Sequence, residues 1–486
     1  MSREVLRDAI IYLPAKVVPA FVGVLTIPVL TRLLTPEQYG QYLLAMASLT
    51  LTAAFCISWL VSITIRFNVV FGVYTLFRYS KHLVTFSIML ACVIWVTISQ
   101  FLNAEIDKEL LVLAGLLWLV SYGAYEYFSG WLRARNFATA YGIAVSWRSI
   151  AGLLLAVFTV AIWSDGAKGV LFGYAGAMLL GLILLPNKAL QADNYDLHRP
   201  LIGSEFRTIL RYGLPAALAN LVTVALSLAD RYVINSQLGP ESVAVYGASY
   251  DIAEKTVFFA NSMLLLSSSV VGFRIFEKEG EAKAAYFLSR LMRLYLLAAP
   301  PLVLVLAILS RDLVMLLLPD QYHSGAEILP IVAFSGLFIG IMHRYSLLLS
   351  FHKRTDIIMW CSLAALVINL ISCNLLVPKH GLLGAALSTA IAYVGWLMLV
   401  RLAALKYIGP RFPWNTLYRV ICALIISAVV MVSLLQTAVL DGFFAISICL
   451  IIGMTSYTLS LFLLGEIKRD EIKSAAFAFK NRINKV

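Results

Sequence analysis

The sequence predicts an all-α polytopic membrane protein with about 14 transmembrane helices. Hydrophobic residues make up 61% of the 486 residues and charged residues only 13%, and the mean hydropathy is +0.87. Soluble domains contain about 45–50% apolar and about 25% charged residues, so this chain has too few charges to cover a water-facing surface. The apolar residues also gather into runs of about 20, the length that crosses a bilayer as a helix.

These apolar runs follow one another along the whole chain, with short polar segments between them. The runs at 243–270 and 327–350 carry ionisable residues and are the least typical spans, whereas several others are nearly free of charge. We expect spans at roughly 10–30, 42–65, 83–102, 110–130, 142–162, 169–186, 209–229, 243–270, 291–309, 327–350, 357–377, 382–402, 416–436 and 443–464.

Lysine and arginine are distributed unequally between the two sides of this bundle. With the N-terminus placed inside, the inner segments hold 29 of the 38 Lys and Arg residues and the outer loops hold 6. Cytoplasmic loops of membrane proteins carry this excess of positive charge. The split predicts that both termini are cytoplasmic. The net charge of +12 follows from the same topology, so we expect no nucleic-acid partner.

The motifs that the sequence lacks exclude several kinds of chemistry. The sequence contains no G-x-x-x-x-G-K-[ST], H-E-x-x-H or G-x-S-x-G pattern, which argues against ATP-driven transport, a metalloprotease and a serine hydrolase. The six cysteines lie in apolar runs without metal-ligand spacing, so we expect no cofactor and no metal site. The longest loop, at about 187–208, is too short to fold alone, and any binding must occur within the helix bundle.

A faint internal repeat relates the two halves of the chain. The first helix begins Leu13-Pro14-Ala15 and the seventh begins Leu214-Pro215-Ala216. After these helices, a shift of 204 places Pro36-Glu37 on Pro240-Glu241. Both helices start from the inner side, six spans apart, which describes a parallel repeat. We expect two pseudo-symmetric six-helix lobes plus two C-terminal helices: an N-terminal lobe at 1–186, a cytoplasmic linker at 187–208, a C-terminal lobe at 209–404, the last two helices within 405–464, and a cytoplasmic tail at 465–486.

Ionisable residues inside the predicted spans are the candidates for function, because a charge at membrane depth costs about 2.5–3.5 kcal/mol. Lys16 lies between Pro14 and Pro19, whose missing N–H groups leave backbone carbonyls that protein or water must satisfy. This pattern favours a cavity-lining first helix. The alternative is a lysine that extends to the inner headgroups.

Three charged residues share one face of the eighth predicted span. Asp251, Glu254 and Lys255 have i, i+3, i+4 spacing, so their side chains lie on the same side of a helix. Such a face meets water or partner charges and not lipid. We expect it to line a central cavity; an internal salt bridge that holds the second lobe together is the alternative.

The other intramembrane charges allow more than one interpretation. Arg148 and Glu126 lie in neighbouring spans, where they either pair with each other or face a cavity. Arg66 and Arg344 lie at inner helix ends, where extension to the headgroups is the simpler interpretation. Asp230-Arg231 ends the seventh apolar run, which predicts a cap or a gate pair at the outer face.

Two segments resemble a known family of transporters. The proline-interrupted first helix that runs into T-R-L-L-T-P-E-Q-Y-G-Q-Y is similar to the start of the polysaccharide-biosynthesis (Wzx-type) flippases. The segment LADRYVINSQLGPESVAVYGASYDIA resembles the second signature of the same family. These flippases belong to the multidrug/oligosaccharidyl-lipid/polysaccharide exporter superfamily, together with lipid II flippases and drug/sodium antiporters. Length and helix count fit the family across the whole chain.

The resemblance implies alternating access and a bacterial inner-membrane flippase that moves an undecaprenyl-pyrophosphate-linked oligosaccharide for O-antigen, capsule or exopolysaccharide assembly. Lipid II flippases carry cavity cations on helices 1 and 8, which are the helices of Lys16 and Lys255 here. The expected partners are the lipid-linked oligosaccharide, the lipid bilayer, a polysaccharide polymerase and a chain-length regulator. The candidate pyrophosphate-binding residues are Lys16, Lys255, Arg148, Arg66 and Arg344, and the candidate coupling residues are Asp251, Glu254 and Glu126.

Two other functions stay open. An ion-coupled multidrug antiporter of the same superfamily would favour cavity carboxylates, and here the deep charges are balanced between three cations and three carboxylates. A membrane polysaccharide polymerase or ligase would be an enzyme with a large outer loop that carries catalytic Arg or His. The longest outer loop here, about 310–326, is short and contains only Arg311 and His323, so we expect a transporter and not an enzyme.

Overall fold

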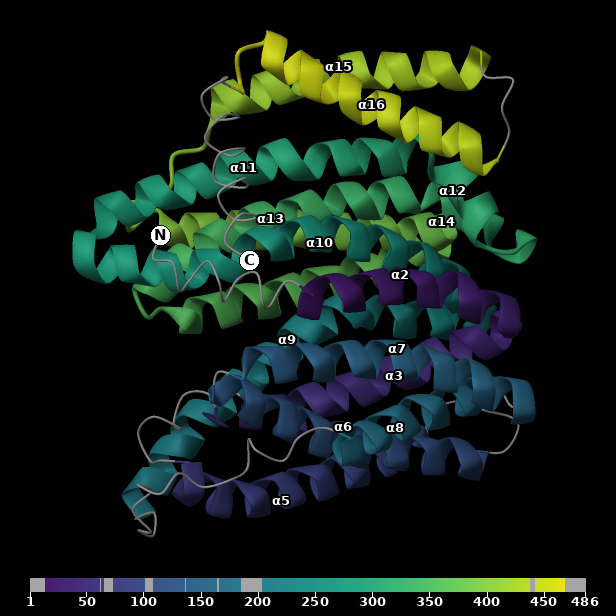
Figure 1. The fold of residues 1–486 in the computed structure, drawn as a ribbon, viewed down its shortest axis with the longest axis vertical. Coiled ribbons are helices and arrows are strands. Elements are labelled where there is room, and N and C mark those ends of the chain that lie inside the picture. Colours follow the sequence, from purple (N-terminus) through teal and green to yellow (C-terminus); the bar gives the residue numbers. More distant parts are fainter. Residues whose placement is uncertain are drawn as a thin grey trace.

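The computed structural model describes residues 14–61, 63–64, 73–100, 108–135, 137–163, 166–184, 203–437 and 442–467. All regular secondary structure in these ranges is helical. The long helices lie roughly side by side, as expected for a bundle whose backbone groups must be satisfied within each spanning segment (Figure 1). The predicted all-α fold is therefore confirmed.

The first group of helices occupies one side of the molecule (the purple and blue part of Figure 1). In this group α5, α6, α7 and α8 pack on one another, and α2 packs along α7. Its members are α2 (Pro14–Leu33), α3 (Pro36–Cys56), α5 (Val73–Ser99), α6 (Lys108–Ala134), α7 (Ala138–Trp163) and α8 (Gly166–Leu184).

The second group fills the other side, and the last two helices form its outer layer (Figure 1). It consists of α9 (Gly203–Leu238), α10 (Pro240–Glu279), α11 (Glu281–Ile308), α12 (Ser310–Leu317), the 3₁₀-helix η2 (Asp320–Glu327), α13 (Leu329–Phe351), α14 (Thr355–Ala404), α15 (Trp414–Thr437) and α16 (Phe443–Leu463).

The helices account for about fourteen spans, as predicted. Eleven of the described helices are long and apolar enough to cross a membrane. Of these, α14 contains two predicted spans joined at Gly381, whose φ of 57° and ψ of −135° turn the chain back; only a residue without Cβ adopts such a conformation readily. The more polar helices α3 and α10 correspond to the spans predicted at 42–65 and 243–270.

The motif T-P-E-Q-Y-G begins α3 and also brings the two groups together. Thr35 and Gln38 form a capping box in which each side chain bonds the other's backbone N–H, the signature of a helix N-terminus. One turn later, a Cβ added at Gly40 would lie only 1.9 Å from the backbone oxygen of Pro240. Glycine is therefore required where α3 crosses the start of α10. The segments that the repeat matched thus pack against each other.

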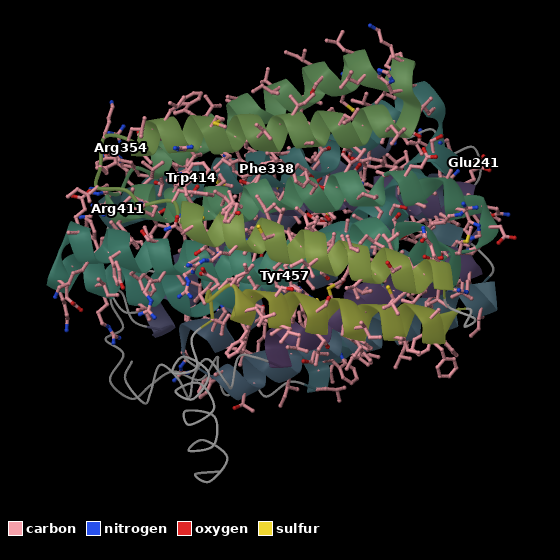
Figure 2. The ribbon with its side chains drawn as sticks, turned by 90° about the horizontal axis from the view of Figure 1, so that it is seen from above. Glu241, Phe338, Arg354, Arg411, Trp414 and Tyr457 are labelled. Atoms are coloured by element: carbon pink, nitrogen blue, oxygen red, sulfur yellow. The ribbon has the colours of Figure 1, made fainter. Side chains whose placement is uncertain are left out.

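The two ends of the bundle are distinct. Arg354, Arg411 and Trp414 lie at one end and Glu241 lies at the opposite end (Figure 2). The first three belong to segments predicted to be inner, and Glu241 to a loop predicted to be outer. The second group of helices therefore presents these predicted inner and outer segments at opposite ends.

One helix, α9, is much longer than its apolar run. The run predicted at 209–229 corresponds to α9, which continues to Leu238. The helix ends only at Gly239, which has a φ of 83° and precedes Pro240. The expectation that Asp230-Arg231 caps this helix is wrong, because both residues lie two turns before its end. The polar stretch after them hides the continuation in a hydropathy pattern.

Candidate functional site

A cluster of charged side chains joins α9 to α10 in the middle of the second group. Arg231 Nη2 donates to Asp251 Oδ1 at 2.7 Å, and Lys255 Nζ lies 3.5 Å from Asp251 Oδ2. The side chains of Arg231, Asp251 and Lys255 are 6%, 16% and 32% exposed. One carboxylate therefore holds two cations in a largely desolvated setting, where charge-assisted hydrogen bonds are strong.

Lys255 also reaches across to the first group of helices. Its Nζ donates to the backbone carbonyl of Gly23 in α2 at 3.1 Å, and its Cδ and Cε pack 3.6 Å from the Cβ position of Gly23. Gly23 lies midway between Pro19 and Pro28, the two prolines inside α2. The lysine that the sequence placed on a cavity face thus lies at the junction of α2 and α10, where it is bound to both sides.

Asp230 is buried beside this cluster and has a full set of donors. Tyr246 donates its hydroxyl to Oδ2 at 2.5 Å, Thr389 donates to the same oxygen at 3.3 Å, and the backbone N–H of Arg231 donates to Oδ1 at 2.9 Å. The residue is 1% exposed. The sequence predicted a terminal pair at Asp230 and Arg231 and did not indicate this site. The signal that could have found them is the distance to the next helix breaker, Gly239-Pro240.

Glu254 lies in the same part of α10 but in a different environment. Within the described ranges it forms no hydrogen bond and no ion pair, although it is only partly exposed. It lines a small cavity of about 30 Å³ between α10, α13 and α14, together with Tyr250, Asn261, Tyr393 and five apolar or glycine residues. The hydroxyls of Tyr250 and Tyr393 bond each other at 2.9 Å.

Arg344 is not at a headgroup interface, which corrects the expectation from its position in the sequence. It is 1% exposed and lies about two turns before the end of α13 at Phe351. Its Nη1 donates to Asn261 Oδ1 and to the carbonyl of Gly340, both at 2.5 Å, and its guanidinium lies 4.4 Å from the centre of the Tyr295 ring. Its Nε and Nη2 have no hydrogen-bond partner among the residues that the structure describes. Packing with α10 and α11, and not snorkelling, accounts for this arginine.

Arg148 and Glu126 pair with each other, which was one of the two interpretations. The ion pair joins α7 to α6, and the side chains are 31% and 23% exposed. The Arg148 guanidinium also lies 5.9 Å from the centre of the Tyr122 ring. Because each charge is already opposed by its partner, this pair offers no net charge to a ligand.

The two remaining candidate cations, Lys16 and Arg66, are not part of the cluster around Asp251 in the described residues. Lys16 is exposed in the first turn of α2, and it forms no ion pair or hydrogen bond within the part of the chain that the structure describes. It lies seven residues, about 10 Å along the helix axis, from Gly23. The structure therefore places Lys16 on the same helix that Lys255 contacts, but not beside Lys255. Arg66 lies outside the described residues.

The comparison with protein families decides where this chain belongs. The family "Polysaccharide biosynthesis protein" matches residues 5–271, more than half of the sequence. The chain belongs to this family. The MatE family also matches, over residues 215–375. No curated protein matches the sequence.

Solved structures share the fold at low sequence identity. The lipid II flippase MurJ in an inward closed conformation has a TM-score of 0.72 and 15% identity over 94% of this chain and 98% of its own. An inward-facing multidrug resistance MATE transporter has a TM-score of 0.60 and 15% identity over 82% of this chain and 98% of its own. A transporter from Pyrococcus furiosus, with a binding pocket described as reversed in polarity, has a TM-score of 0.58 and 12% identity over 82% of this chain and 95% of its own.

These matches give a coarse function. The chain is a multi-pass membrane protein with the MurJ/MATE fold of the multidrug/oligosaccharidyl-lipid/polysaccharide exporter superfamily, as the sequence predicted. The matched structures are transporters and flippases, not enzymes. The MurJ match covers 94% of this chain, whereas the MATE match covers 82%.

Proposed function

We propose that this protein flips an undecaprenyl-pyrophosphate-linked oligosaccharide across a bacterial inner membrane by alternating access, for assembly of a surface polysaccharide such as O-antigen, capsule or exopolysaccharide. The observation that carries the proposal is Lys255, a cation that bonds a backbone carbonyl of α2 across the junction of the two helix groups. A carbonyl is a weak partner for an ammonium, and a diphosphate oxygen is a much stronger one.

Electrostatics explains why such a cargo needs this junction. A diphosphate that crosses about 30 Å of hydrocarbon loses its hydration, and fixed cations replace the lost water only where they are already desolvated. Asp251 fixes the positions of both cations: its carboxylate oxygens lie 3.5 Å from Lys255 Nζ and 2.7 Å from Arg231 Nη2. In the proposed mechanism α2 and α10 separate, Lys255 exchanges the Gly23 carbonyl for the diphosphate, and the prenyl tail stays in lipid.

The contacts of the other candidate residues support a role in binding the diphosphate for some of them and not for others. Lys16, exposed on α2 without a partner in the described ranges, fits a first contact for the diphosphate at the inner surface. Arg66, outside the described residues, keeps its place only as a sequence prediction. Arg148 is neutralised by Glu126, and Arg344 is buried among α10, α11 and α13, so we assign neither to the headgroup. For the same reason we withdraw Glu126 as a coupling residue.

The proposal includes an architecture and a topology. The two groups of helices act as the two six-helix lobes, α15 and α16 are the additional pair, and both termini are cytoplasmic. A polymerase and a chain-length regulator then act on the cargo after transport. Reporter fusions test the topology: a fusion at Val486 reports a cytoplasmic position and one at Asp441 an outer position. A periplasmic signal at Val486 would contradict it.

The test of function is headgroup flipping in proteoliposomes that contain undecaprenyl-pyrophosphate-linked oligosaccharide. We expect Lys255→Ala to slow flipping by about tenfold or more, because a hydrogen bond to a charged group contributes about 1.5–3 kcal/mol. Lys16→Ala slows it less, and Lys255→Arg keeps part of the rate. Lys283→Ala is the matched control, since Lys283 is 68% exposed and pairs with Glu279.

Two outcomes would contradict the proposal. Wild-type flipping by the Lys16→Ala/Lys255→Ala double variant would show that neither lysine carries the headgroup. Export of lipophilic cations without any flipping of the lipid-linked sugar would favour the multidrug antiporter, the alternative that the MATE matches keep open.

A further inference from the structure

The charges around the α9–α10 cluster do not balance. Arg231 and Lys255 supply two positive charges, whereas Asp230, Asp251 and Glu254 supply three carboxylates within the same part of the second group. An uncompensated buried charge is costly, and a buried group without a partner avoids the cost by becoming neutral. One bound proton would make the cluster neutral, so the question is which carboxylate holds it.

The hydrogen bonds single out one of the three. Asp230 accepts from Tyr246, Thr389 and the backbone N–H of Arg231, and these donors favour a negative carboxylate. Asp251 has a guanidinium at 2.7 Å and an ammonium at 3.5 Å. Glu254 has neither a hydrogen bond nor an ion pair within the described ranges. A proton on Glu254 therefore disturbs no contact, whereas a proton on either aspartate would weaken several.

The cavity beside Glu254 has the size and polarity to hold a water molecule. Its volume of about 30 Å³ exceeds the roughly 10–15 Å³ that one water requires. Glu254 and Asn261 lie two turns apart on the same face of α10, and both line it. Asn261 also bonds Arg344 Nη1 and His343 Nδ1, the latter at 2.8 Å. A water in the cavity would find polar partners in Glu254 and Asn261.

The titratable groups that surround Glu254 come from every neighbouring element. Two of them are cations close enough to oppose protonation, but both are bound to Asp251. Among the described residues, Asp230 and Arg231 on α9, Tyr250, Asp251 and Lys255 on α10, and Tyr393 on α14 interact electrostatically with Glu254. His343 and Arg344 on α13 bond Asn261, which lines the same cavity.

We propose that Glu254 and its cavity form a proton-binding site in which the carboxyl takes up one proton beside one water molecule, and that its occupancy is linked to headgroup binding at Lys255. The linkage, but not the proton itself, rests on the proposed function. A diphosphate that engages Lys255 and Arg231 adds negative charge and draws both cations away from Asp251. The cluster then has a larger negative excess, and proton uptake at Glu254 offsets it. By reciprocity, protonation strengthens diphosphate binding.

The first experiment detects the proton directly and needs no substrate. Infrared spectroscopy of the full-length protein in detergent at neutral pH should show the C=O band of a protonated carboxyl group. Glu254→Gln should remove it, and Glu277→Gln, an exposed carboxylate of the same helix, should leave it unchanged. Absence of the band from the wild type, or its persistence in Glu254→Gln, would overturn the proposal whether or not the protein is a flippase.

The second experiment measures the linkage with farnesyl diphosphate as the probe. Titration calorimetry in two buffers of different ionisation enthalpy gives the number of protons taken up on binding. We expect net uptake in the wild type and in Glu277→Gln. Glu254→Gln, which imitates the neutral acid, should still bind but take up no proton at Glu254, and its affinity should lose the rise that the wild type shows as pH falls.

The outcomes separate the two proposals. Unchanged proton uptake in Glu254→Gln would overturn the linkage while leaving the diphosphate site intact. If farnesyl diphosphate does not bind to the wild type, the headgroup role of Lys255 and with it the linkage are wrong, whereas the infrared band still decides the proton site. Glu254→Asp offers a conservative check, since a shortened acid should restore part of the proton uptake.

Discussion

The charged residues in the two halves of the bundle are organised differently. In the first half, Arg148 and Glu126 pair one to one between α7 and α6, two helices of the same group. In the second half, Asp251 holds both Arg231 and Lys255, and Lys255 continues to the Gly23 carbonyl on the opposite side of the junction. The Arg148–Glu126 pair has both partners within one group of helices. The Asp251 cluster instead connects the two groups, whose contacts must change in an alternating-access transporter.

The difference shows that charges within the membrane can serve different roles, either pairing neighbouring helices of one group or contributing to transport. A neutral pair within one rigid group adds no field at the junction and moves with its helices. The cluster around Asp251 has one more carboxylate than it has cations, and its Lys255 is bound to a carbonyl. Lys255 can therefore exchange partners when α2 and α10 move apart. The charges that take part in transport are therefore expected to be those whose partners lie across the junction of α2 and α10, which changes during alternating access.

The largest effect that tests this comparison is the loss of Arg231. Arg231→Met removes the closer of the two cations at Asp251 and leaves a largely buried carboxylate with Lys255 alone. Breaking a buried ion pair in this way costs about 3–5 kcal/mol. We therefore expect a marked fall in the melting temperature of the purified protein in detergent, measured by intrinsic fluorescence.

The control for this prediction removes both charges. Arg231→Met with Asp251→Asn leaves no orphaned carboxylate at that position and should recover much of the lost stability, because Lys255 keeps its bond to Gly23. Equal melting temperatures for the single and double variants would show that packing of the Arg231 side chain, and not its charge, stabilises the junction.

A smaller effect is expected for the pair in the first half. The side chains of Arg148 and Glu126 are 31% and 23% exposed, so solvent screens part of their attraction. Arg148→Met should lower stability by about 1–2 kcal/mol through the unpaired Glu126, and Arg148→Met with Glu126→Gln should recover it. Flipping by the double variant should stay within about twofold of the wild type. A strong loss of flipping in a stable double variant would make this pair part of the transport path.

Composition and periodicity were sufficient for the fold, because a spanning helix must satisfy its own backbone and present about 20 apolar residues. The spacing of Asp251, Glu254 and Lys255 also showed correctly that all three belong to one region of α10. What sequence spacing could not give is which partner each side chain finds on another helix. Asp251 and Glu254 look equivalent along the chain, yet one holds two cations and the other faces a cavity.

The positions of Arg344 and Arg231 also could not be predicted from sequence spacing alone. Arg344 looked like an interfacial residue because it lies towards the inner end of its predicted span, but contacts with Asn261 of α10 and Tyr295 of α11 bury it. Arg231 looked like a terminal residue because the sequence after it is polar, but α9 continues to Leu238. For Arg231 the apolar run was shorter than the helix, since protein contacts, unlike lipid, tolerate polar residues in the last turns; for Arg344 the run matched the helix, and only contacts with other helices showed the burial.

An effect of similar size, but dependent on pH, is expected for Glu466, a carboxylate whose surroundings are the opposite of those of Glu254. It lies just after α16 and is 4% exposed. It accepts from Arg293 Nε at 2.7 Å, Thr416 Oγ1 at 2.7 Å and Arg419 Nη1 at 2.9 Å, which ties α16 to α11 and α15. Burial alone would raise the pKa of Glu466, but the hydrogen bonds from Arg293, Thr416 and Arg419 outweigh it and lower the pKa below its usual value of 4.5.

The lowered pKa fixes the direction of a pH test. A carboxyl whose pKa is lower in the folded state contributes stability above its unfolded pKa, and this contribution is lost as pH falls through the folded value. Glu466→Gln should therefore lower the melting temperature by a few degrees at pH 7, corresponding to about 2 kcal/mol for hydrogen bonds to a charged group. The gap between variant and wild type should narrow as the pH falls below 4.5 and should close once the pH is below the lowered pKa of Glu466, where the wild-type carboxyl is itself protonated. Glu277→Gln, with an exposed side chain, should show no gap at either pH. A Glu466→Gln gap that persists in acid would mean that the shape of the side chain, and not its charge, holds α15 and α16 against α11.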